Sequence, residues 1–388
     1  MASMRISTRV DRIPLSRTLA LDARAKELAA EGRDIVNMTA GEPDFDSPQV
    51  VRDTAKEVID GGRVRYTPAS GRLELRREIA GYLERTRGVS YAPSQITVCH
   101  SAKHALSGSL LALVEEGDEV LLLLPAWVSY VEQVRFAGGV AVGVEPRPDM
   151  GPDLEALARA VTPRTKGLML NSPNNPSGYV ATPEEFAAIA AFAREHDLWI
   201  LSDEIYGRLV YEGETFGSPI QHGDDALART VVVDGASKTY SMTGYRIGFV
   251  AGDPGVAAAV GRLHSQLTGA PNAIGQEAFG AALREEPPEV ASMCEAFRTR
   301  RDRIMQGLEE LGLRTPPAAG AFYVFPDVTS VWDKGSDAFC EALLEGEGLA
   351  IVPGTAFGVE GHVRFSYATS MERIEEGLAR LGRFLGGL

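Results

Sequence analysis

The chain of 388 residues has few cysteines and no long apolar run. Cys99, Cys294 and Cys340 are odd in number and scattered, which favours reduced thiols in a cytoplasm over a disulfide framework. No apolar run reaches the roughly 18 to 20 residues that a membrane-spanning helix needs. The first residues, 1–7, carry charge without the apolar segment of a secretory signal. We therefore expect a cytoplasmic protein with no membrane partner.

Positive charge and histidine are also scarce. The 39 Lys and Arg against 53 Asp and Glu give a net charge of -14, and phosphate backbones repel such a chain unless its basic residues are segregated. The arginines between residues 298 and 303 alternate with acidic residues at helical spacing, which is typical of a solvated helix face. His100 is expected to be a packed strand-end residue, because no second histidine or acid is noted at metal-ligand spacing. We expect neither a nucleic-acid partner nor a metal.

The middle of the chain alternates short apolar runs with longer amphipathic stretches, which predicts an α/β domain with a mainly parallel sheet. Helices are expected over 103–114, 154–160 and 183–195. The last of these has a threonine cap at Thr182 and a proline in its first turn. The seven expected strands are 95–99, 119–124, 140–144, 167–170, 198–201, 230–233 and 247–251.

The two ends of the chain differ from this middle. A helix is expected over 15–30, and the tail beyond about residue 290 reads as helix, strand, helix, strand, helix. A long helix over 287–311 would join the two parts. We therefore expect a large domain of residues 46–290 and a smaller α+β domain formed by residues 1–45 and 291–388.

The segment 235–248 places Lys238 between small residues, directly after an apolar run. A lysine at the end of a buried strand loses hydration, which disfavours its charged form and makes its amine available as a nucleophile toward an aldehyde. Arg246, eight positions on, suits a phosphate because a guanidinium offers paired donors. Pyridoxal phosphate carries both an aldehyde and a phosphate. On this segment alone, a turn with a solvated lysine is an equal alternative.

Other strand ends carry matching side chains, and ligands of open α/β sheets bind at that edge. Asp203 could hold a pyridinium nitrogen protonated, or it could cap the following turn. Tyr206, three residues later, and Asn175, in a rigid turn before a proline, could both meet a phenolic oxygen.

Two further strand ends complete the set. Ser101 and Ala102 open a helix whose free N–H groups could bind an anion. Trp127 could stack on a flat heterocycle or belong to the core.

Together these segments resemble the ordered motif set of the class I/II aminotransferases. The resemblance covers about residues 30–380 and is closest to the bacterial aspartate aminotransferase subgroup, including members that accept prephenate. It implies fold type I of the pyridoxal-phosphate-dependent transferases, with a mainly parallel seven-stranded sheet in the large domain. The segments that carry it are 39–45, 171–178, 202–206, 238–248 and 363–367.

The resemblance also implies roles toward pyridoxal 5'-phosphate. Lys238 would hold the cofactor covalently and move the proton between the α-carbon of the amino acid and C4′ of the cofactor. Asp203 would pair with the ring nitrogen, and Tyr206 and Asn175 with the phenolic oxygen. Trp127 would stack on the ring. The phosphate would be held by Ser101, Ala102 and Arg246, with Lys103 adjacent and Ser237 as a helper. Many relatives have serine where this chain has Gly235.

The implied substrate contacts begin with Arg364, which would grip the α-carboxylate by a two-pronged contact. Gly41, Trp127 and Asn175 would contribute to the same site. Lys103 would meet the distal carboxylate of an acidic substrate, and a solvated lysine is the alternative. Arg12 could add a second contact to that acid. Tyr66 would reach the phosphate of the neighbouring subunit, which implies a homodimer.

These inferences predict an enzyme that moves the amino group of L-aspartate to 2-oxoglutarate by a ping-pong mechanism. One alternative is an aminotransferase of another amino acid or of prephenate. Another is a lyase or oxidase that uses the same cofactor site. A non-catalytic sensor that binds the cofactor is a third, and the absence of a basic DNA-binding module in the sequence disfavours it.

Overall fold

The computed structural model describes residues 17–211 and 216–387, together with Met4, Ile6, Ser7, Val10 and Ile13. Its main feature is a seven-stranded sheet with the order β2-β8-β7-β6-β5-β3-β4. All neighbours are parallel except β8, which runs antiparallel to both β2 and β7. The strands are β2 (Ile96–Cys99), β3 (Glu119–Leu123), β4 (Val140–Val144), β5 (Thr165–Asn171), β6 (Trp199–Asp203), β7 (Thr230–Gly235) and β8 (Gly248–Ala251).

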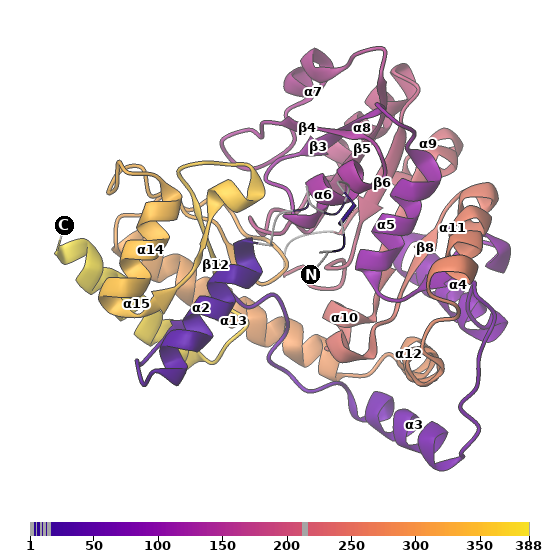
Figure 1. The fold of residues 1–388 in the computed structure, drawn as a ribbon, viewed down its shortest axis with the longest axis horizontal. Coiled ribbons are helices and arrows are strands. Elements are labelled where there is room, and N and C mark those ends of the chain that lie inside the picture. The colour runs from indigo at the N-terminus through magenta and orange to yellow at the C-terminus, as the bar shows by residue number, and fades with distance from the viewer. Residues whose placement is uncertain are drawn as a thin grey trace.

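Helices cover both faces of this sheet (Figure 1), because the central strands β7 and β8 are buried along their whole length. The helix α8 (Pro183–Glu195) shows how sequence sets such an element. The Thr182 hydroxyl accepts from the backbone N–H of Glu185, whose carboxylate accepts in return from the N–H of Thr182. The others are α3 (Gln49–Asp60), α4 (Leu73–Arg87), α5 (Ala102–Leu113), α6 (Ser129–Phe136), α7 (Leu154–Ala160), α9 (Asp224–Arg229), α10 (Ala236–Thr239), α11 (Pro254–Leu267) and α12 (Ala273–Glu285), with short 3-10 turns η1 (Pro93–Gln95), η2 (Pro219–Gln221) and η3 (Thr243–Tyr245).

The described N-terminal helix α2 and the C-terminal helices α14 and α15 lie together in a second group of elements, at the left of Figure 1. The parallel pair β1–β10 joins Val36 to Leu349, and a three-stranded sheet has the order β11-β12-β9. The long helix α13 runs from this group toward the large sheet. Bounds are α2 (Arg17–Ala30), α13 (Glu289–Glu310), α14 (Ser336–Glu347), α15 (Met371–Gly386), β1 (Val36–Asn37), β9 (Tyr323–Val324), β10 (Leu349–Ala350), β11 (Val352–Pro353), β12 (Val363–Ser366) and η4 (Gly354–Phe357).

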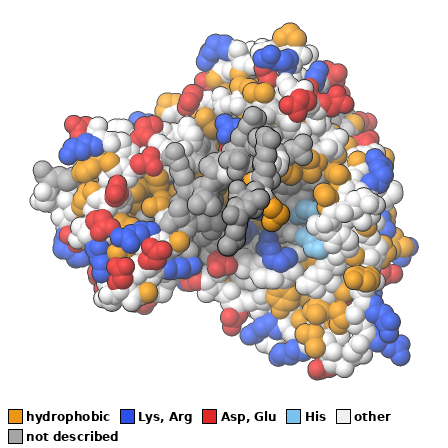
Figure 2. Space-filling model, viewed as in Figure 1, with side chains coloured by type: hydrophobic (Ala, Val, Ile, Leu, Met, Phe, Trp, Pro, Cys, Tyr) orange, Lys and Arg blue, Asp and Glu red, His pale blue; other side chains and the backbone are white. Residues whose placement is uncertain are grey.

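The expected seven strands are confirmed, and all belong to one sheet. The arginines of α13 pair with acidic side chains, as in Arg298–Glu295 at 2.6 Å and Arg303–Glu375 at 2.5 Å. Charges of both signs are interspersed over the described residues of the face in Figure 2. None of the helices in the described ranges has the length and apolar character to cross a bilayer.

Candidate active site

A cavity of about 680 Å³ opens at the carboxyl ends of β5, β6 and β7. Parallel strands deliver their following loops to one edge, which is why segments far apart in sequence meet there. All of the predicted site residues except Tyr66 line this cavity: Gly41, Ser101, Ala102, Lys103, Trp127, Asn175, Asp203, Tyr206, Ser237, Lys238, Arg246 and Arg364.

Lys238 lies in the short helix α10, directly after β7, and is half-buried. Its Nζ donates to the backbone oxygen of Gly41. Burial lowers the pKa of the amine to about 8. A substantial fraction of the amine is therefore neutral near neutral pH, which is the form that attacks an aldehyde.

Asp203 lies buried at the end of β6. Its Oδ2 accepts from the Tyr130 hydroxyl at 2.6 Å, and its Oδ1 accepts from the N–H of Ile205 at 3.2 Å. The second contact is the turn cap that the sequence allowed as an alternative. One carboxylate oxygen can thus cap the turn while the carboxylate also lines the cavity. Burial raises the pKa of Asp203 to about 6. The carboxylate is ionised above that pH, and it is suited to a cationic ring nitrogen.

The turn after β5 presents Asn175 to the cavity. Asn171 fixes this turn, because its Nδ2 donates to the backbone oxygen of Asp203 at 2.9 Å and its Oδ1 accepts from the N–H of Asn175 at 2.8 Å. Tyr206 comes from the next loop, and its hydroxyl lies 3.0 Å from that of Tyr323. Both predicted partners of a phenolic oxygen thus reach the same cavity.

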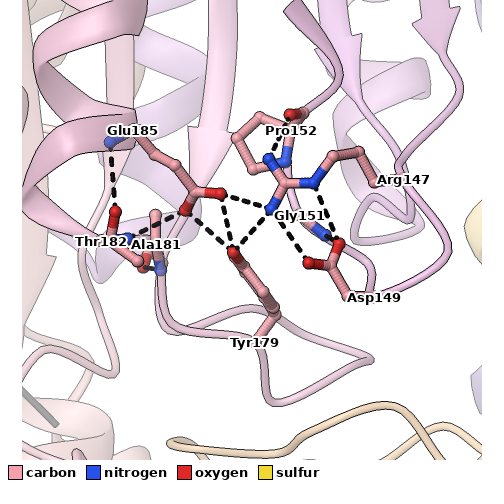
Figure 3. Close-up of polar contacts among 9 residues, drawn as sticks. Arg147, Asp149, Gly151, Pro152, Tyr179, Ala181, Thr182 and Glu185 are labelled. Atoms are coloured by element: carbon pink, nitrogen blue, oxygen red, sulfur yellow. Dashed lines mark hydrogen bonds and ion pairs between the residues drawn. The ribbon is translucent and has the colours of Figure 1, made fainter.

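A polar cluster on the far side of that turn holds it in place (Figure 3). The Tyr179 hydroxyl donates to Glu185 at 2.8 Å and lies 3.1 Å from Nη2 of Arg147. Arg147 also pairs with Asp149 at 3.0 Å. The backbone oxygen of Tyr179 accepts from the N–H of Asn174 at 2.8 Å. The capped helix α8 is therefore tied to the turn that carries Asn175.

The start of α5 is the anion-binding edge of the cavity. Ser101 is its buried N-cap residue, with a φ of 92°, and Ala102 follows. A Cβ at Gly248 would lie 2.4 Å from the N of Ala102, so only glycine lets β8 pass this turn. Arg246 lines the same cavity, and its Nη1 donates to the backbone oxygen of Thr243 at 2.7 Å. The N–H groups of a helix start suit a phosphate, as does an arginine that pairs with no acid among the residues the structure describes.

Gly235 replaces the serine of many relatives, and the structure gives a reason for glycine here. A Cβ at this position would lie 2.7 Å from the Cα of Gly248, which β8 brings close in register. Ser237 does line the cavity and is buried. Its role as the substitute hydroxyl stays a prediction.

Arg364 is 3% exposed and lies on β12, at the opposite end of the cavity. Its Nη1 donates to Oδ1 of Asn175 at 2.9 Å and its Nη2 to the backbone oxygen of Thr39 at 2.7 Å. Its buried Nε has no hydrogen-bond partner in the described chain. The ring of Tyr323 lies 4.5 Å from the guanidinium carbon. A buried guanidinium with a free donor, and with no acid paired to it in residues 17–211 and 216–387, is suited to a carboxylate ligand.

Lys103 and Trp127 lie together at the cavity wall. Nζ of Lys103 is 4.8 Å from the centre of the Trp127 ring. Burial lowers the pKa of Lys103, and the charge of Arg246 adds to that effect. Tyr66 lies elsewhere: its side chain is fully exposed, at 101%, and does not line the cavity. Arg12 lies outside the described residues.

Several neighbours of the site escaped sequence reasoning. Tyr130 is three residues after Trp127 at the start of α6, and that helical spacing was the available signal. Tyr323 carried no such signal, because its contact with Tyr206 spans 117 positions in sequence.

The premise that no second histidine sits at metal-ligand spacing from His100 was wrong. His104, four residues on, stacks on His264 with ring centroids 4.3 Å apart, and His100 lies 5.4 Å from His104. No group of three or more potential ligands in the described ranges is placed to hold a metal ion.

The site combines an amine with lowered pKa, a buried carboxylate, an anion-binding helix start and a buried arginine whose Nε has no partner among the described residues. These residues fit pyridoxal phosphate, which presents an aldehyde, a ring nitrogen and a phosphate to such partners, so the fold and site define a pyridoxal-phosphate-dependent enzyme. The chain belongs to the aminotransferase class I and II family, whose model matches residues 33–381. It is a transaminase, and its cofactor is pyridoxal 5'-phosphate.

Similar proteins span the whole chain. An aspartate/prephenate aminotransferase of Thermus thermophilus is 45% identical over 98% of this chain and 99% of its own. An aspartate aminotransferase of Bacillus subtilis is 42% identical, with the same coverage. Among solved structures, the aspartate aminotransferase of Thermus thermophilus with maleate matches at a TM-score of 0.94 and 44% identity, over 98% of this chain and 100% of that one. The enzyme of Rhizobium meliloti matches at 0.96 and 34% identity, over 99% of each.

Proposed function

We propose that this enzyme transfers the amino group of L-aspartate to 2-oxoglutarate by a ping-pong mechanism. The observation that carries the proposal is the buried guanidinium of Arg364, whose Nε is without a partner and which pairs with no acid in the described part of the chain. It lies in one cavity with Lys238 and Lys103. A dicarboxylic amino acid offers one carboxylate to each of two cations and its amino group to the centre. The names of the similar enzymes from Thermus and Bacillus support the same donor.

Arg364 would orient the substrate by its α-carboxylate. The contacts of Arg364 to Asn175 and Thr39 fix the plane of the guanidinium. Its donors would therefore bind a carboxylate in one orientation only. Gly41 would line the same end through its backbone. Holding the α-carbon in one orientation is worth several kcal/mol of the barrier in enzymes generally.

Pyridoxal phosphate, when bound, supplies an electron sink for negative charge at the α-carbon. Lys238 would hold the cofactor between turnovers and then carry the proton from the α-carbon, a task that its pKa of about 8 allows near neutral pH. Asp203 would keep the ring nitrogen protonated. Tyr206 and Asn175 would bind the phenolic oxygen, and Trp127 would cover the ring face. Ser101, Ala102, Ser237 and Arg246 would hold the phosphate.

Lys103 would give the enzyme its selectivity for an acidic substrate. Its partly buried ammonium lies beside the Trp127 ring, where a distal carboxylate would meet it with less screening than in bulk water. Prephenate is a second candidate substrate, because the 45% identical Thermus enzyme is named for aspartate and prephenate. A lyase or oxidase outcome has no observation in its favour.

We further propose a cytoplasmic homodimer. The similarity to the aminotransferase family is its basis, and the side chain of Tyr66, fully exposed on one subunit, is free to reach a partner. In this arrangement, Tyr66 would complete the phosphate site of the neighbouring subunit. We also keep the division into a large domain (46–290) and a small domain (1–45 with 291–388) as a proposal, which the pairing of β1 with β10 supports.

The test is a product assay on purified holoenzyme. Aspartate and 2-oxoglutarate should yield glutamate and oxaloacetate in equal amounts. Lys238→Ala should abolish turnover and the visible absorption of the bound cofactor, because both the anchor and the proton carrier are lost. Pyruvate or peroxide without glutamate would contradict the proposed reaction, and near-normal turnover of Lys238→Ala would contradict the role of the lysine.

A further inference from the structure

A buried ion-pair cluster lies behind the two strand ends that carry Asp203 and Lys238. Arg87, the last residue of α4, has a side chain that is 1% exposed, and its Nε donates to Oε2 of Glu204 at 2.9 Å. Its Nη2 lies 3.5 Å from Oδ2 of Asp234. Glu204 directly follows Asp203, and Asp234 comes four residues before Lys238. One guanidinium therefore bridges the ends of β6 and β7 where each strand turns into the active site.

The two acids of this cluster are held by further hydrogen bonds. Oε1 of Glu204 accepts from the hydroxyls of Ser202 and Ser218. Oδ1 of Asp234 accepts from the N–H of Gly235 at 2.6 Å, and Oδ2 accepts from the Tyr82 hydroxyl at 3.2 Å. Among the described residues, Arg87 contacts both carboxylates. The strand ends are also joined by the sheet itself, because the N–H of Glu204 donates to the backbone oxygen of Val233 at 2.8 Å.

The guanidinium of Arg87 is closely surrounded, and its Nη1 and Nη2 have no hydrogen-bond partner among the described residues. The ring of Phe216 lies 4.1 Å from the guanidinium carbon. A Cβ at Gly207 would lie 2.8 Å from Nη2 of Arg87 and 3.0 Å from the backbone oxygen of Glu204. Buried ion pairs are poor devices for stability, since apolar residues of similar volume often stabilise as well or better. Stability alone therefore does not account for the ion pairs of Arg87 with Glu204 and Asp234, which lie beside the active site.

The charged and titratable groups near the bridge come from several elements. Tyr82, Tyr91, Arg208 and Tyr240 face the cluster, with Glu204 and Asp234 themselves. Burial raises the pKa of Asp234 to about 7, and the charge of Arg87 opposes this.

Around the site itself, Tyr130, Glu204 and Lys238 face Asp203, and Glu42, Arg246, Arg364 and Asp203 face Lys238. The charge of Asp203 raises the pKa of Lys238, against the larger effect of burial. The titration of Lys238 therefore depends first on burial and on Glu42, and to a smaller extent on the placement of Asp203.

We propose that Arg87 is a positioning residue of the transamination reaction: by bridging Glu204 and Asp234 it fixes the end of β6 against the end of β7, and with them Asp203 against Lys238. The inference rests on the proposed function. An ammonium in place of the guanidinium would keep the charge but could not span both acids in the same geometry.

The test uses two variants and a matched control pair. Arg87→Lys keeps the charge, and Arg87→Met combined with Glu204→Gln removes one charge of each sign, so that the core remains able to fold. The controls are Arg164→Lys and Arg164→Met with Glu119→Gln. Arg164 and Glu119 form a pair at 2.6 Å at the opposite, amino-terminal edge of the same sheet.

Three quantities are measured for each protein. The first is the pH midpoint of amine labelling at Lys238 in the cofactor-free chain, located by peptide mass mapping. The second is kcat and KM for aspartate in the holoenzyme, and the third is the melting temperature. Glutamate formation by the wild-type enzyme tests the proposed function separately, because the labelling requires no substrate.

In both Arg87 variants we expect the labelling midpoint to fall by about a few tenths of a pH unit, since Asp203 then supports the charge of Lys238 less well. We expect kcat to fall about tenfold, because a displaced Asp203 or Lys238 would slow the chemical step. KM for aspartate should stay within about twofold of the wild-type value, because neither substrate carboxylate contacts these two residues in the proposed site. The Arg164 variants should lose melting temperature only. An unchanged or raised midpoint with wild-type kcat in the Arg87 variants, or equal changes in the Arg164 variants, would overturn the proposal.

Discussion

In the proposed reaction, single side chains of this cavity would determine substrate selectivity, and Lys103 is the clearest case. Its ammonium is partly buried against Trp127, so its attraction for a second carboxylate is stronger than at an open surface. In the proposed reaction, Arg364 would serve every amino acid alike, because all of them carry the α-carboxylate. Selectivity for an acidic donor would therefore depend on the lysine.

Lys103→Ala should raise KM for aspartate by about tenfold to a hundredfold, as expected for a lost charged hydrogen bond of about 1.5 to 3 kcal/mol. KM for an aromatic donor should change little, since that substrate has no distal charge. Steady-state kinetics with both donors measures the difference. Equal changes for the two donors would remove the case for an acidic substrate.

His104 gives a prediction for pH. Burial lowers its pKa to about 4, and the charges of His264 and His100 act in the same direction. In the unfolded chain a histidine titrates near 6.5, so the unfolded state binds more protons between those values. The free energy of unfolding should therefore fall as the pH drops from about 6.5 toward 4. The stability that the neutral His104 contributes is fully present above pH 6.5.

Urea unfolding at pH 5 and pH 7.5 checks this dependence. His104→Gln should reduce the loss of stability between the two pH values, whereas His222→Gln, outside the cluster, should leave it as in the wild type. A loss of the same size in His104→Gln would show that other groups cause it.

At the level of elements, strand and helix positions were predictable because local patterns set them. The helix 183–195 begins and ends as expected, since Thr182 and Pro183 are local signals. The edge carrying Asp203, Lys238 and Asn175 was also predictable, because strand ends of a parallel sheet share one side. The pairing of Arg364 with Asn175, of Tyr206 with Tyr323, and the histidine stack join distant segments, and no local pattern encodes them.

The cap of α8 supports a prediction of stability. Thr182→Ala should lower the free energy of unfolding by about 1 kcal/mol, because it leaves the N–H of Glu185 without its side-chain acceptor. Thr299→Ala is the matched control: that exposed hydroxyl donates to a carbonyl within the long helix α13, and its loss should change stability by no more than about 0.5 kcal/mol. Denaturant titrations of both variants give the comparison, and equal values would contradict the role of the cap.

At the scale of the whole molecule, Tyr66 predicts shared sites. If it completes the partner's phosphate site, Tyr66→Ala and Lys238→Ala should each be strongly impaired alone. In a mixed dimer of the two variants, one site would contain an intact Lys238 and an intact Tyr66. Co-expression in equal amounts should therefore restore about a quarter of wild-type activity, given random pairing into twofold dimers. Activity equal to the mean of the separate variants would show that Tyr66 acts within its own chain or not at all.

The parallel pairing of β1 with β10 has a consequence for how the polypeptide is made. Val36 and Asn37 leave the ribosome early, and their partners Leu349 and Ala350 emerge only near the end of translation. The central sheet can be complete before then, because domains assemble as they are synthesised. The earliest part of the nascent chain must therefore wait, unpaired, until almost everything else has been built.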